Sequence, residues 1–288
     1  MRRLTKLCNK SACRIQGLFG RSDTLFVNAL AAFLICASGC APLSVTDYAA
    51  DHQMTVHQVA GNGFSHLVIQ RTGSPPGSRL HVYIEGDGIP WRGNFPSVDP
   101  TPRNTLALRL ASLDPNDIAY VGRPCYFGTA NADECHPRYW TSHRYGEEVL
   151  RSMASTIQRI RDPRHTELLL IGHSGGGVLA ALLESKLDGV VGVITIGANL
   201  DIERWAQHHH YDPLTGSLNP LEQTRDPDIP HLQLVGGSDK TVPASSGDNY
   251  ARIQANVELV VFDDFDHVCC WEEQWPIILS EFSARLID

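Results

Sequence analysis

A serine in a glycine-rich turn is the residue of this sequence best placed to do chemistry. Ser174 lies in the run Gly-His-Ser-Gly-Gly-Gly at residues 172–177. Four apolar residues precede this turn, as in a strand buried on both faces, and apolar residues at helical spacing follow it. Strand, turn and helix are the context in which G-x-S-x-G forms a nucleophile elbow, which lifts the serine hydroxyl above the sheet. Gly172 and Gly176 stand where a side chain would prevent the turn from closing.

The alternative for the same glycines is a turn that binds phosphate at a helix N-terminus. The spacing of the usual phosphate loop, G-x-x-x-x-G-K-[ST], is absent, and no lysine follows the glycines. The flanking pattern therefore favours the nucleophile elbow.

A nucleophilic serine also needs a base and an acid. The hydroxyl reacts at neutral pH when an imidazole accepts its proton, and a carboxylate fixes the tautomer of that imidazole. Asp239 and His267 follow the strands predicted at 231–235 and 257–262. Since the carboxyl ends of parallel strands meet at one edge of a sheet, these two side chains are expected beside Ser174. The alternative acid is Asp201, which follows the strand predicted at 190–196.

The rest of the pattern predicts a sheet covered by helices. Further strands are expected at 54–59, 66–71, 79–84, 118–121 and 168–171, and helices at 103–113, 142–161, after Pro243 and at 271–286. Strands that alternate with helices indicate a mostly parallel sheet with helices on both faces. Residues 199–230 interrupt this alternation with polar and aromatic residues, and we expect a small cap there over the active-site edge of the sheet.

The order serine, acid, histidine, each after a strand, resembles the α/β-hydrolase superfamily. The resemblance covers residues 54–288 and implies the α/β-hydrolase fold with an eight-stranded sheet. It also implies that Ser174 is the nucleophile, His267 the general base and Asp239 the orienting acid, with no cofactor and no metal. Four local stretches resemble a group of bacterial exported hydrolases, and they lie at residues 122–125, 139–142, 216–220 and 267–271.

In this superfamily two backbone N–H groups bind the developing oxyanion. The resemblance assigns them to Gly175 and to Asp87, in the loop after the strand at 79–84. That loop reads Glu-Gly-Asp-Gly at 85–88. In those members of the superfamily that have a His-Gly pair there, the residue after the glycine is the donor, which corresponds to Asp87. Acidic side chains beside an oxyanion oppose it unless they point away or are held by hydrogen bonds. The alternative is that one of them, Glu85 or Asp87, binds a cationic group of the substrate.

Other polar residues near the predicted site have structural interpretations. His173 adjoins the nucleophile, but neighbouring residues of a strand point apart, so it is expected to pack or to face the substrate. The histidines at 208–210 are expected on the solvated surface of the cap, because adjacent residues rarely converge on one metal ion. Loop-capping or surface positions are expected for Asp263, Asp264 and Asp266.

Residues 1–39 have the pattern of an export signal. Six basic residues and one acidic residue precede an apolar run at 25–37, which is too short to span a bilayer. Ala-Ser-Gly-Cys at 37–40 resembles the lipobox of bacterial lipoproteins, which implies a lipid-modified Cys40 as the mature N-terminus. The alternative is an ordinary secretory signal cut nearby. We expect residues 40–53 to form a tether, and the protein to be attached through its lipid to the outer membrane, facing the periplasm.

The charge balance limits the partners. The 288-residue chain has 42% hydrophobic and 19% charged residues, as in an ordinary globular protein with room for one large α/β domain. Without residues 1–39 it holds 18 basic and 31 acidic residues, a formal net charge of −13. Nucleic acid is therefore not an expected partner, because phosphate binding needs a basic face. Membrane contact would rest on the lipid rather than on a polybasic patch.

Export also places the cysteines in an oxidising compartment. Four cysteines lie in the predicted domain, and they permit three pairings. Cys125 with Cys135 closes a short loop and is the pairing we expect. Cys269 and Cys270 then form either a vicinal bridge or a pair of buried thiols.

Together these patterns predict a serine hydrolase of the cell envelope. We expect it to cleave a carboxyl ester, of a small molecule or a lipid, through an acyl-enzyme. Two alternatives stay open: a serine peptidase or amidase, since the same three residues cleave amides, and a catalytically silent binding lipoprotein. The intact order of serine, acid and histidine weighs against the silent protein, because a binding module does not need it.

Overall fold

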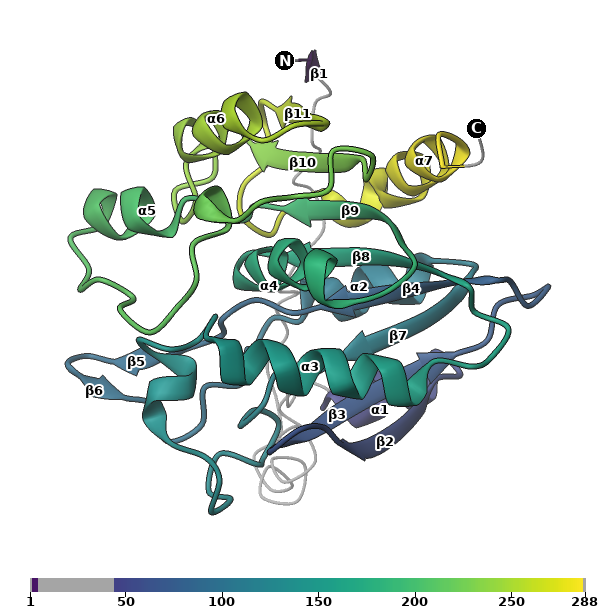
Figure 1. Cartoon of the computed structure of the whole chain (residues 1–288), viewed down its shortest axis with the longest axis horizontal. Coiled ribbons are helices and arrows are strands. Elements are labelled where there is room, and N and C mark those ends of the chain that lie inside the picture. The colour runs from purple at the N-terminus through teal and green to yellow at the C-terminus, as the bar shows by residue number, and fades with distance from the viewer. Residues whose placement is uncertain (1, 5–43, 287–288) are drawn as a thin grey trace, which may run out of the picture.

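A nine-stranded sheet runs through the centre of the protein (Figure 1). The structure is a computed structural model that describes residues 2–4 and 44–286. The strands follow the order β1-β11-β10-β9-β8-β4-β7-β3-β2 across the sheet. Only the β2–β3 and β3–β7 pairs are antiparallel among the described strands of this sheet.

Eight of these strands lie at or near their predicted positions. They are β2 (Thr55–Ala60), β3 (Ser65–Arg71), β4 (Arg79–Ile84), β7 (Asp117–Val121), β8 (Glu167–His173), β9 (Val190–Ile196), β10 (His231–Gly236) and β11 (Val257–Phe262). The predicted eight-stranded, mostly parallel sheet is therefore confirmed. The ninth strand, β1 (Arg2–Leu4), comes from the predicted export signal and pairs with β11.

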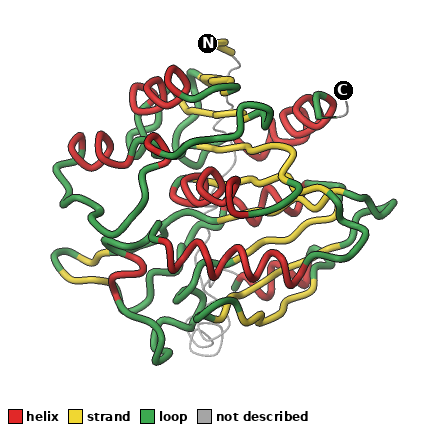
Figure 2. Tube along the Cα trace, viewed as in Figure 1, coloured by secondary structure: helices red, strands yellow, loops and turns green. Residues whose placement is uncertain are grey.

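The helices form one layer on each face of the sheet, as Figure 2 shows. The first layer holds α3 (Glu147–Ile160), α4 (Gly175–Leu183) and α6 (Ala244–Ile253), and the second holds α1 (Val45–Asp51), α2 (Leu106–Leu113) and α7 (Trp271–Ala284). In β8, Leu168 and Leu170 pack with the first layer, whereas Leu169 and Ile171 pack with the second. Burial on both faces explains why this strand is apolar throughout.

A tether was expected at residues 40–53, but residues 45–51 of this segment form helix α1. Ser44 caps this helix, its side chain accepting a hydrogen bond from the N–H of Asp47, and Ala49 is buried in the core. The hydroxyl of Tyr48 lies 2.9 Å from Ser112 Oγ at the end of α2. The segment is part of the domain, and its two turns are too short to produce a recognisable apolar period.

The sequence also did not predict a small hairpin after β4, formed by β5 (Trp91–Arg92) and β6 (Phe95–Pro96). Its apolar side chains face solvent: Trp91 is 45% exposed, Phe95 77% and the following Val98 76%.

The segment predicted as a cap holds α5 (Ile202–His208) and the 3-10 helix η3 (Pro220–Glu222), joined by loops. Two more 3-10 helices are η1 (Pro137–Trp140) and η2 (Glu184–Lys186). Helix α5 and the β5–β6 hairpin lie at the end of the sheet where the parallel strands finish (Figure 1). Across residues 2–4 and 44–286, every helix is too short or too polar to cross a lipid bilayer.

A buried histidine ties three elements together. His66 of β3 is fully buried, with Nδ1 2.8 Å from the Gly122 carbonyl oxygen and Nε2 2.7 Å from Ser152 Oγ in α3. Because a carbonyl oxygen only accepts, Nδ1 carries the proton and Nε2 accepts from the serine hydroxyl. Burial lowers the pKa of His66 to about 4, although the bond to Gly122 opposes this shift.

We therefore expect the protein to lose stability in mild acid. Between about pH 6.5 and pH 4 the unfolded chain binds a proton at His66 that the folded chain does not, so the free energy of unfolding falls as the pH falls. By about pH 5 the loss should be about 2 kcal/mol. Urea unfolding of the wild type and of His66→Asn, which keeps a donor for Gly122, measures it. His231, whose pKa burial also lowers, is present in both proteins. Equal losses in the two proteins would contradict the role of His66.

Candidate active site

Ser174 sits on a strained turn between β8 and α4. Its φ of 53° and ψ of −126° lie outside the regions that side chains usually allow, and its N–H donates to the Ile196 carbonyl oxygen at 2.8 Å. A Cβ on Gly172 would lie 2.2 Å from the carbonyl oxygen of Gly176, and a Cβ on Gly176 would lie 2.2 Å from that of Ile84. The turn therefore requires both glycines, as the sequence predicted.

His267 and Asp239 form an ion-pair-type contact. His267 Nδ1 lies 2.8 Å from Asp239 Oδ2, and the Asp239 side chain is fully buried. The other oxygen, Oδ1, accepts from the N–H groups of Thr241 and Val242 at 2.8 and 2.9 Å. Because a carboxylate only accepts, Nδ1 of His267 carries the proton, which leaves Nε2 able to accept one.

The end of β9 contacts both Ser174 and the His267–Asp239 pair. Ile196 accepts the N–H of Ser174, and the next residue, Gly197, adjoins the pair: a Cβ there would lie 3.2 Å from Asp239 Oδ2 and 3.3 Å from His267 Nδ1. Within residues 44–286 no hydrogen bond joins Ser174 Oγ to His267. Such bonds are often long before a substrate binds and tighten in its presence.

The other candidate acids have different partners. Asp201 caps α5, with Oδ1 accepting the N–H of Arg204 at 3.2 Å and Oδ2 accepting from Asn249 at 2.9 Å. Asp266 accepts the N–H groups of Val268 and Cys269, so it stabilises the loop that carries His267. Of Asp239 and Asp201, only Asp239 contacts the histidine.

His173 is buried and contacts the loop that carries His267, a partner that the sequence did not indicate. It is 5% exposed, its Nε2 lies 2.9 Å from the main-chain oxygen of His267, and the two rings are 4.8 Å apart. It therefore joins the end of β8 to the loop after β11. The two residues are 94 positions apart, and no local pattern signals such a link.

Asp87 and Gly175, the expected oxyanion donors, have free N–H groups. Among the described residues neither N–H has a hydrogen-bond partner. The loop of Asp87 comes close to Ser174, because a Cβ on Gly86 would lie 3.1 Å from Ser174 Cβ. Two N–H groups without a partner among the described residues therefore lie near Ser174, one in the loop after β4 and one at the start of α4.

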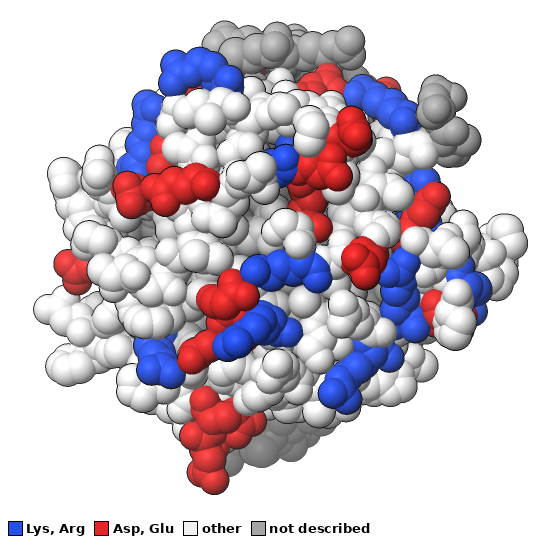
Figure 3. Space-filling view, in the orientation of Figure 1, with Lys and Arg blue, Asp and Glu red and all other residues white. Residues whose placement is uncertain are grey.

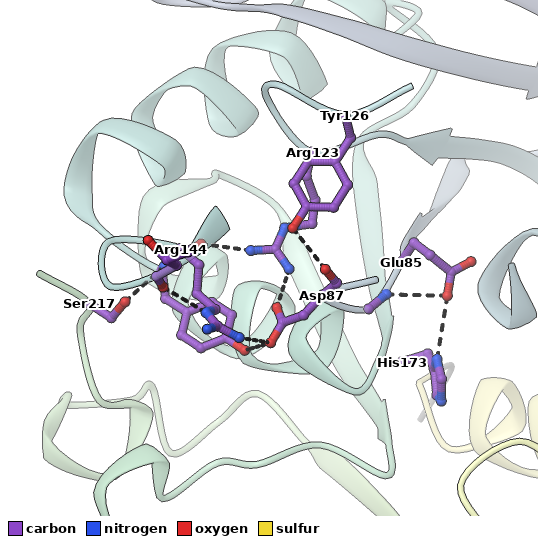
Figure 4. A network of polar contacts seen from close by, with 10 residues as sticks. Glu85, Asp87, Arg123, Tyr126, Arg144, His173 and Ser217 are labelled. Atoms are coloured by element: carbon purple, nitrogen blue, oxygen red, sulfur yellow. Dashed lines mark hydrogen bonds and ion pairs between the residues drawn. The ribbon is translucent and has the colours of Figure 1, made fainter. Parts of the chain in front are cut away.

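The Asp87 side chain is enclosed by cationic and hydroxyl donors (Figure 4). Oδ1 accepts from Arg123, and Oδ2 accepts from Arg144 at 2.8 Å and from the Tyr145 hydroxyl at 2.6 Å. Tyr126 donates its hydroxyl to the Asp87 main-chain oxygen at 2.9 Å. Burial alone would raise the pKa of Asp87, but the Arg144 and Arg123 charges hold it well below its usual range.

Glu85 points toward the start of α2. Its carboxylate accepts the N–H of Ala107 at 3.1 Å and that of Gly86 at 3.2 Å, and His173 Nδ1 lies 3.4 Å away. Both acidic residues of the loop are thus held by donors. Since both oxygens of Asp87 are already used, the alternative in which this residue binds a cationic substrate group is not supported.

Two disulfides flank the site. Cys125 is bonded to Cys135, with Cα atoms 5.6 Å apart, and Cys269 is bonded to its neighbour Cys270. The first pairing is the one expected from the sequence, and the second is the vicinal one of the two states left open. Cys125 follows Arg123 by two residues, so the first bridge starts beside the donors of Asp87.

Of the three histidines at 208–210, one packs and two face solvent. His209 stacks on Tyr211 with ring centroids 5.2 Å apart, and its Nε2 lies 2.8 Å from the Thr241 carbonyl oxygen. His208 and His210 are exposed. In the part of the chain that the structure describes, His, Cys, Asp and Glu side chains do not gather in groups of three or more that could hold a metal ion.

A cavity of about 790 Å³ lies away from these residues. Its lining includes Leu80 and Asp117, at the amino ends of β4 and β7, and Arg164. Because Ser174, Asp239 and His267 lie at the carboxyl ends, this cavity is not part of the candidate site.

Comparisons with known proteins agree with this architecture. No family model and no curated protein matches the sequence. Among solved structures, an esterase from Pyrococcus furiosus is 13% identical and has a TM-score of 0.58, with 82% of this chain and 94% of that chain covered. An α/β serine hydrolase from Xanthomonas campestris, described as lacking a lid, is 12% identical with a TM-score of 0.55 and coverages of 80% and 94%. A bacterial membrane phospholipase A is 16% identical with a TM-score of 0.54 and coverages of 83% and 92%.

These likenesses and the strand order together identify the fold. The protein has the α/β-hydrolase fold, as its motifs predicted.

The contact between His267 and Asp239 predicts a specific proton signal. The Nδ1 proton shared with a carboxylate should give a far-downfield ¹H NMR resonance, because a charge-assisted hydrogen bond is short and strong. Asp239→Asn should remove this resonance, and Asp201→Asn, the matched control, should leave it unchanged. Loss of the signal in Asp201→Asn alone would show that the acid is wrongly assigned.

Proposed function

We propose that this protein is a serine hydrolase that cleaves a carboxyl ester through an acyl-enzyme. The observation that carries the proposal is the 2.8 Å contact of His267 Nδ1 with Asp239 Oδ2 beside a serine held at a φ of 53°. A binding protein would not need a strained serine next to an oriented imidazole.

The first half of the reaction forms the acyl-enzyme. Ser174 Oγ attacks the carbonyl carbon of the ester while its proton passes to His267 Nε2. The imidazolium that results is stabilised by Asp239, and the N–H groups of Gly175 and Asp87 bind the oxyanion. Collapse of this intermediate breaks the bond to the alcohol, which leaves with the proton from Nε2.

The second half releases the acid. Water attacks the acyl carbon and gives its proton to His267 Nε2, and the oxyanion forms again in the same hole. Collapse breaks the bond to Ser174, whose oxygen recovers the proton. Asp239 stays ionised throughout, and no group outside the chain is consumed except water.

An ester with an apolar group is favoured by the surroundings of the site. The exposed Trp91, Phe95 and Val98 lie on the segment that continues the Asp87 loop. Figure 3 shows few charged side chains on the flank where Figure 1 places this hairpin and α5. Two proteins of similar fold are an esterase and a phospholipase A, which supports esters of small molecules or lipids as the class to test.

The alternative reaction is cleavage of an amide. The same groups perform it, with His267 protonating an amine instead of an alcohol. A panel of matched esters and amides with one acyl group decides between the two. A higher kcat/KM for the amides would replace the esterase by a peptidase or amidase.

We also propose that the protein is exported and attached to a membrane by a lipid on Cys40. The support is the signal-like segment 1–39 and the Ala-Ser-Gly-Cys run; Cys40 itself lies outside the described residues. The Cys125–Cys135 bridge fits an oxidising compartment. Facing the periplasm, the enzyme would meet lipid esters at the membrane surface.

Replacing the nucleophile tests the activity. Ser174→Ala should abolish labelling by a fluorophosphonate probe and ester hydrolysis, because the attacking oxygen is gone, while far-UV circular dichroism stays as in the wild type. Asp239→Asn should lower kcat by about 10⁴, since it favours the wrong imidazole tautomer. If the folded wild type is not labelled, the proposed activity is wrong and the alternative of a catalytically silent binding protein takes its place.

Replacing the cysteine tests the location. In a Gram-negative host the wild type should fractionate with membranes, and Cys40→Ala should be released or retained as an uncleaved precursor. Mass spectrometry of the mature N-terminus measures the modification directly. An unmodified Cys40 in the mature protein would rule out the lipid anchor.

A further inference from the structure

The Asp87 carboxylate lies against the nucleophile elbow. A Cβ on Gly175 would lie 2.0 Å from Asp87 Oδ1 and 2.7 Å from the Tyr145 hydroxyl. The acid is thus next to the same residue whose N–H is assigned to the oxyanion. An uncompensated negative charge at this distance would raise the energy of the oxyanion in a poorly solvated site.

Two buried arginines compensate that charge. Arg123 is 1% exposed and Arg144 is 5% exposed, and each contacts a different oxygen of Asp87. One carboxylate thus faces two guanidinium groups, so the cluster carries a formal charge of +1. The two arginines therefore more than balance the charge of Asp87, and the cluster as a whole does not repel an oxyanion.

The arginines are themselves fixed by the main chain. Arg123, which follows β7, donates Nη2 to the Arg144 carbonyl oxygen at 2.9 Å, and Arg144 donates Nε to the Thr141 carbonyl oxygen at 2.7 Å. With Tyr126 holding the Asp87 carbonyl, the residue is held at both its side chain and its main chain. Its N–H is left unpaired among the described groups.

We infer that Arg123, Arg144 and Tyr145 are positioning residues for the oxyanion hole. They fix the Asp87 backbone so that its N–H serves as a donor, and the two arginines cancel the carboxylate charge beside the hole. This inference rests on the proposed serine hydrolase function. It explains how an acidic side chain in the Glu-Gly-Asp-Gly loop can lie beside the Gly175 N–H without opposing an oxyanion there.

The test is a double-mutant cycle on ester hydrolysis by the full protein. Arg144→Gln should lower kcat about 10²-fold, because a misplaced or opposed donor costs this much, and should change KM less than about threefold. Adding Asp87→Asn to Arg144→Gln should recover about tenfold of the lost kcat, since the second change removes the charge that the first exposed. A purely structural role predicts no such recovery in kcat.

A matched control separates catalysis from stability. Arg225 forms another buried pair, with Glu184 at 2.7 Å, and Glu184 lies at the opposite end of α4 from the Asp87 loop. Arg225→Gln should lower the melting temperature without lowering kcat. If Arg144→Gln does not fold, Tyr145→Phe removes only one hydroxyl and should lower kcat about tenfold, with KM unchanged. Equal kcat losses in Arg225→Gln, or unchanged kcat in both Arg144→Gln and Tyr145→Phe, overturn the inference.

Probe labelling distinguishes this failure from that of the proposed function. If the wild type is labelled at Ser174 and the variants turn over esters as fast as the wild type, only the positioning role is wrong. If the wild type is not labelled and cleaves no ester, the proposed function fails as well.

Discussion

A contact of backbone with backbone at Gly176 determines the geometry of the site. A Cβ at this position would lie 2.2 Å from the carbonyl oxygen of Ile84 and 2.5 Å from that of Glu85, so the start of α4 touches the end of β4 directly. The same contact brings the loop after β4 beside Ser174. Any side chain at position 176 would push the loop after β4 away from Ser174 as well as distort the turn. One steric constraint thus places both Ser174 and the loop of Asp87.

Buried charge is the second constraint, and each charged group near the serine is held by more than one donor. Asp239 accepts hydrogen bonds from two backbone N–H groups and from His267. Glu85 accepts from the N–H groups of Gly86 and Ala107. Asp87 accepts from two arginines and a tyrosine. Removing one partner from such a group leaves an unpaired charge in a poorly solvated place, which is strongly unfavourable. Several partners for each carboxylate therefore fix these side chains in place, which is the kind of preorganisation that the proposed reaction would need.

The peripheral segments are attached to this centre. Ser217, in the segment predicted as a cap, accepts the N–H of Tyr145 at 3.1 Å and donates to the Ser142 carbonyl oxygen at 2.9 Å (Figure 4). Tyr126, which holds the Asp87 carbonyl, directly follows Cys125 of the first disulfide. Residues 199–230 and the disulfide loop thus contact the residues that hold the loop of Asp87, so a change in either segment can alter the position of that loop.

The sequence by itself determined the parts of this protein that depend on local pattern. Apolar runs and their period predicted eight strands and the main helices, and the glycines around Ser174 predicted the elbow, because a turn without space for Cβ atoms restricts residue type. Helix α1 and the β5–β6 hairpin escaped, since elements this short have no period to detect. Only the tertiary structure decided that Asp239 and not Asp201 meets His267, that His173 supports the histidine loop, and that Arg123 and Arg144 enclose Asp87. Each of these depends on side chains from strand ends and loops far apart in the chain, and their approach is set by the packing of the sheet and its helices, which no local spacing encodes.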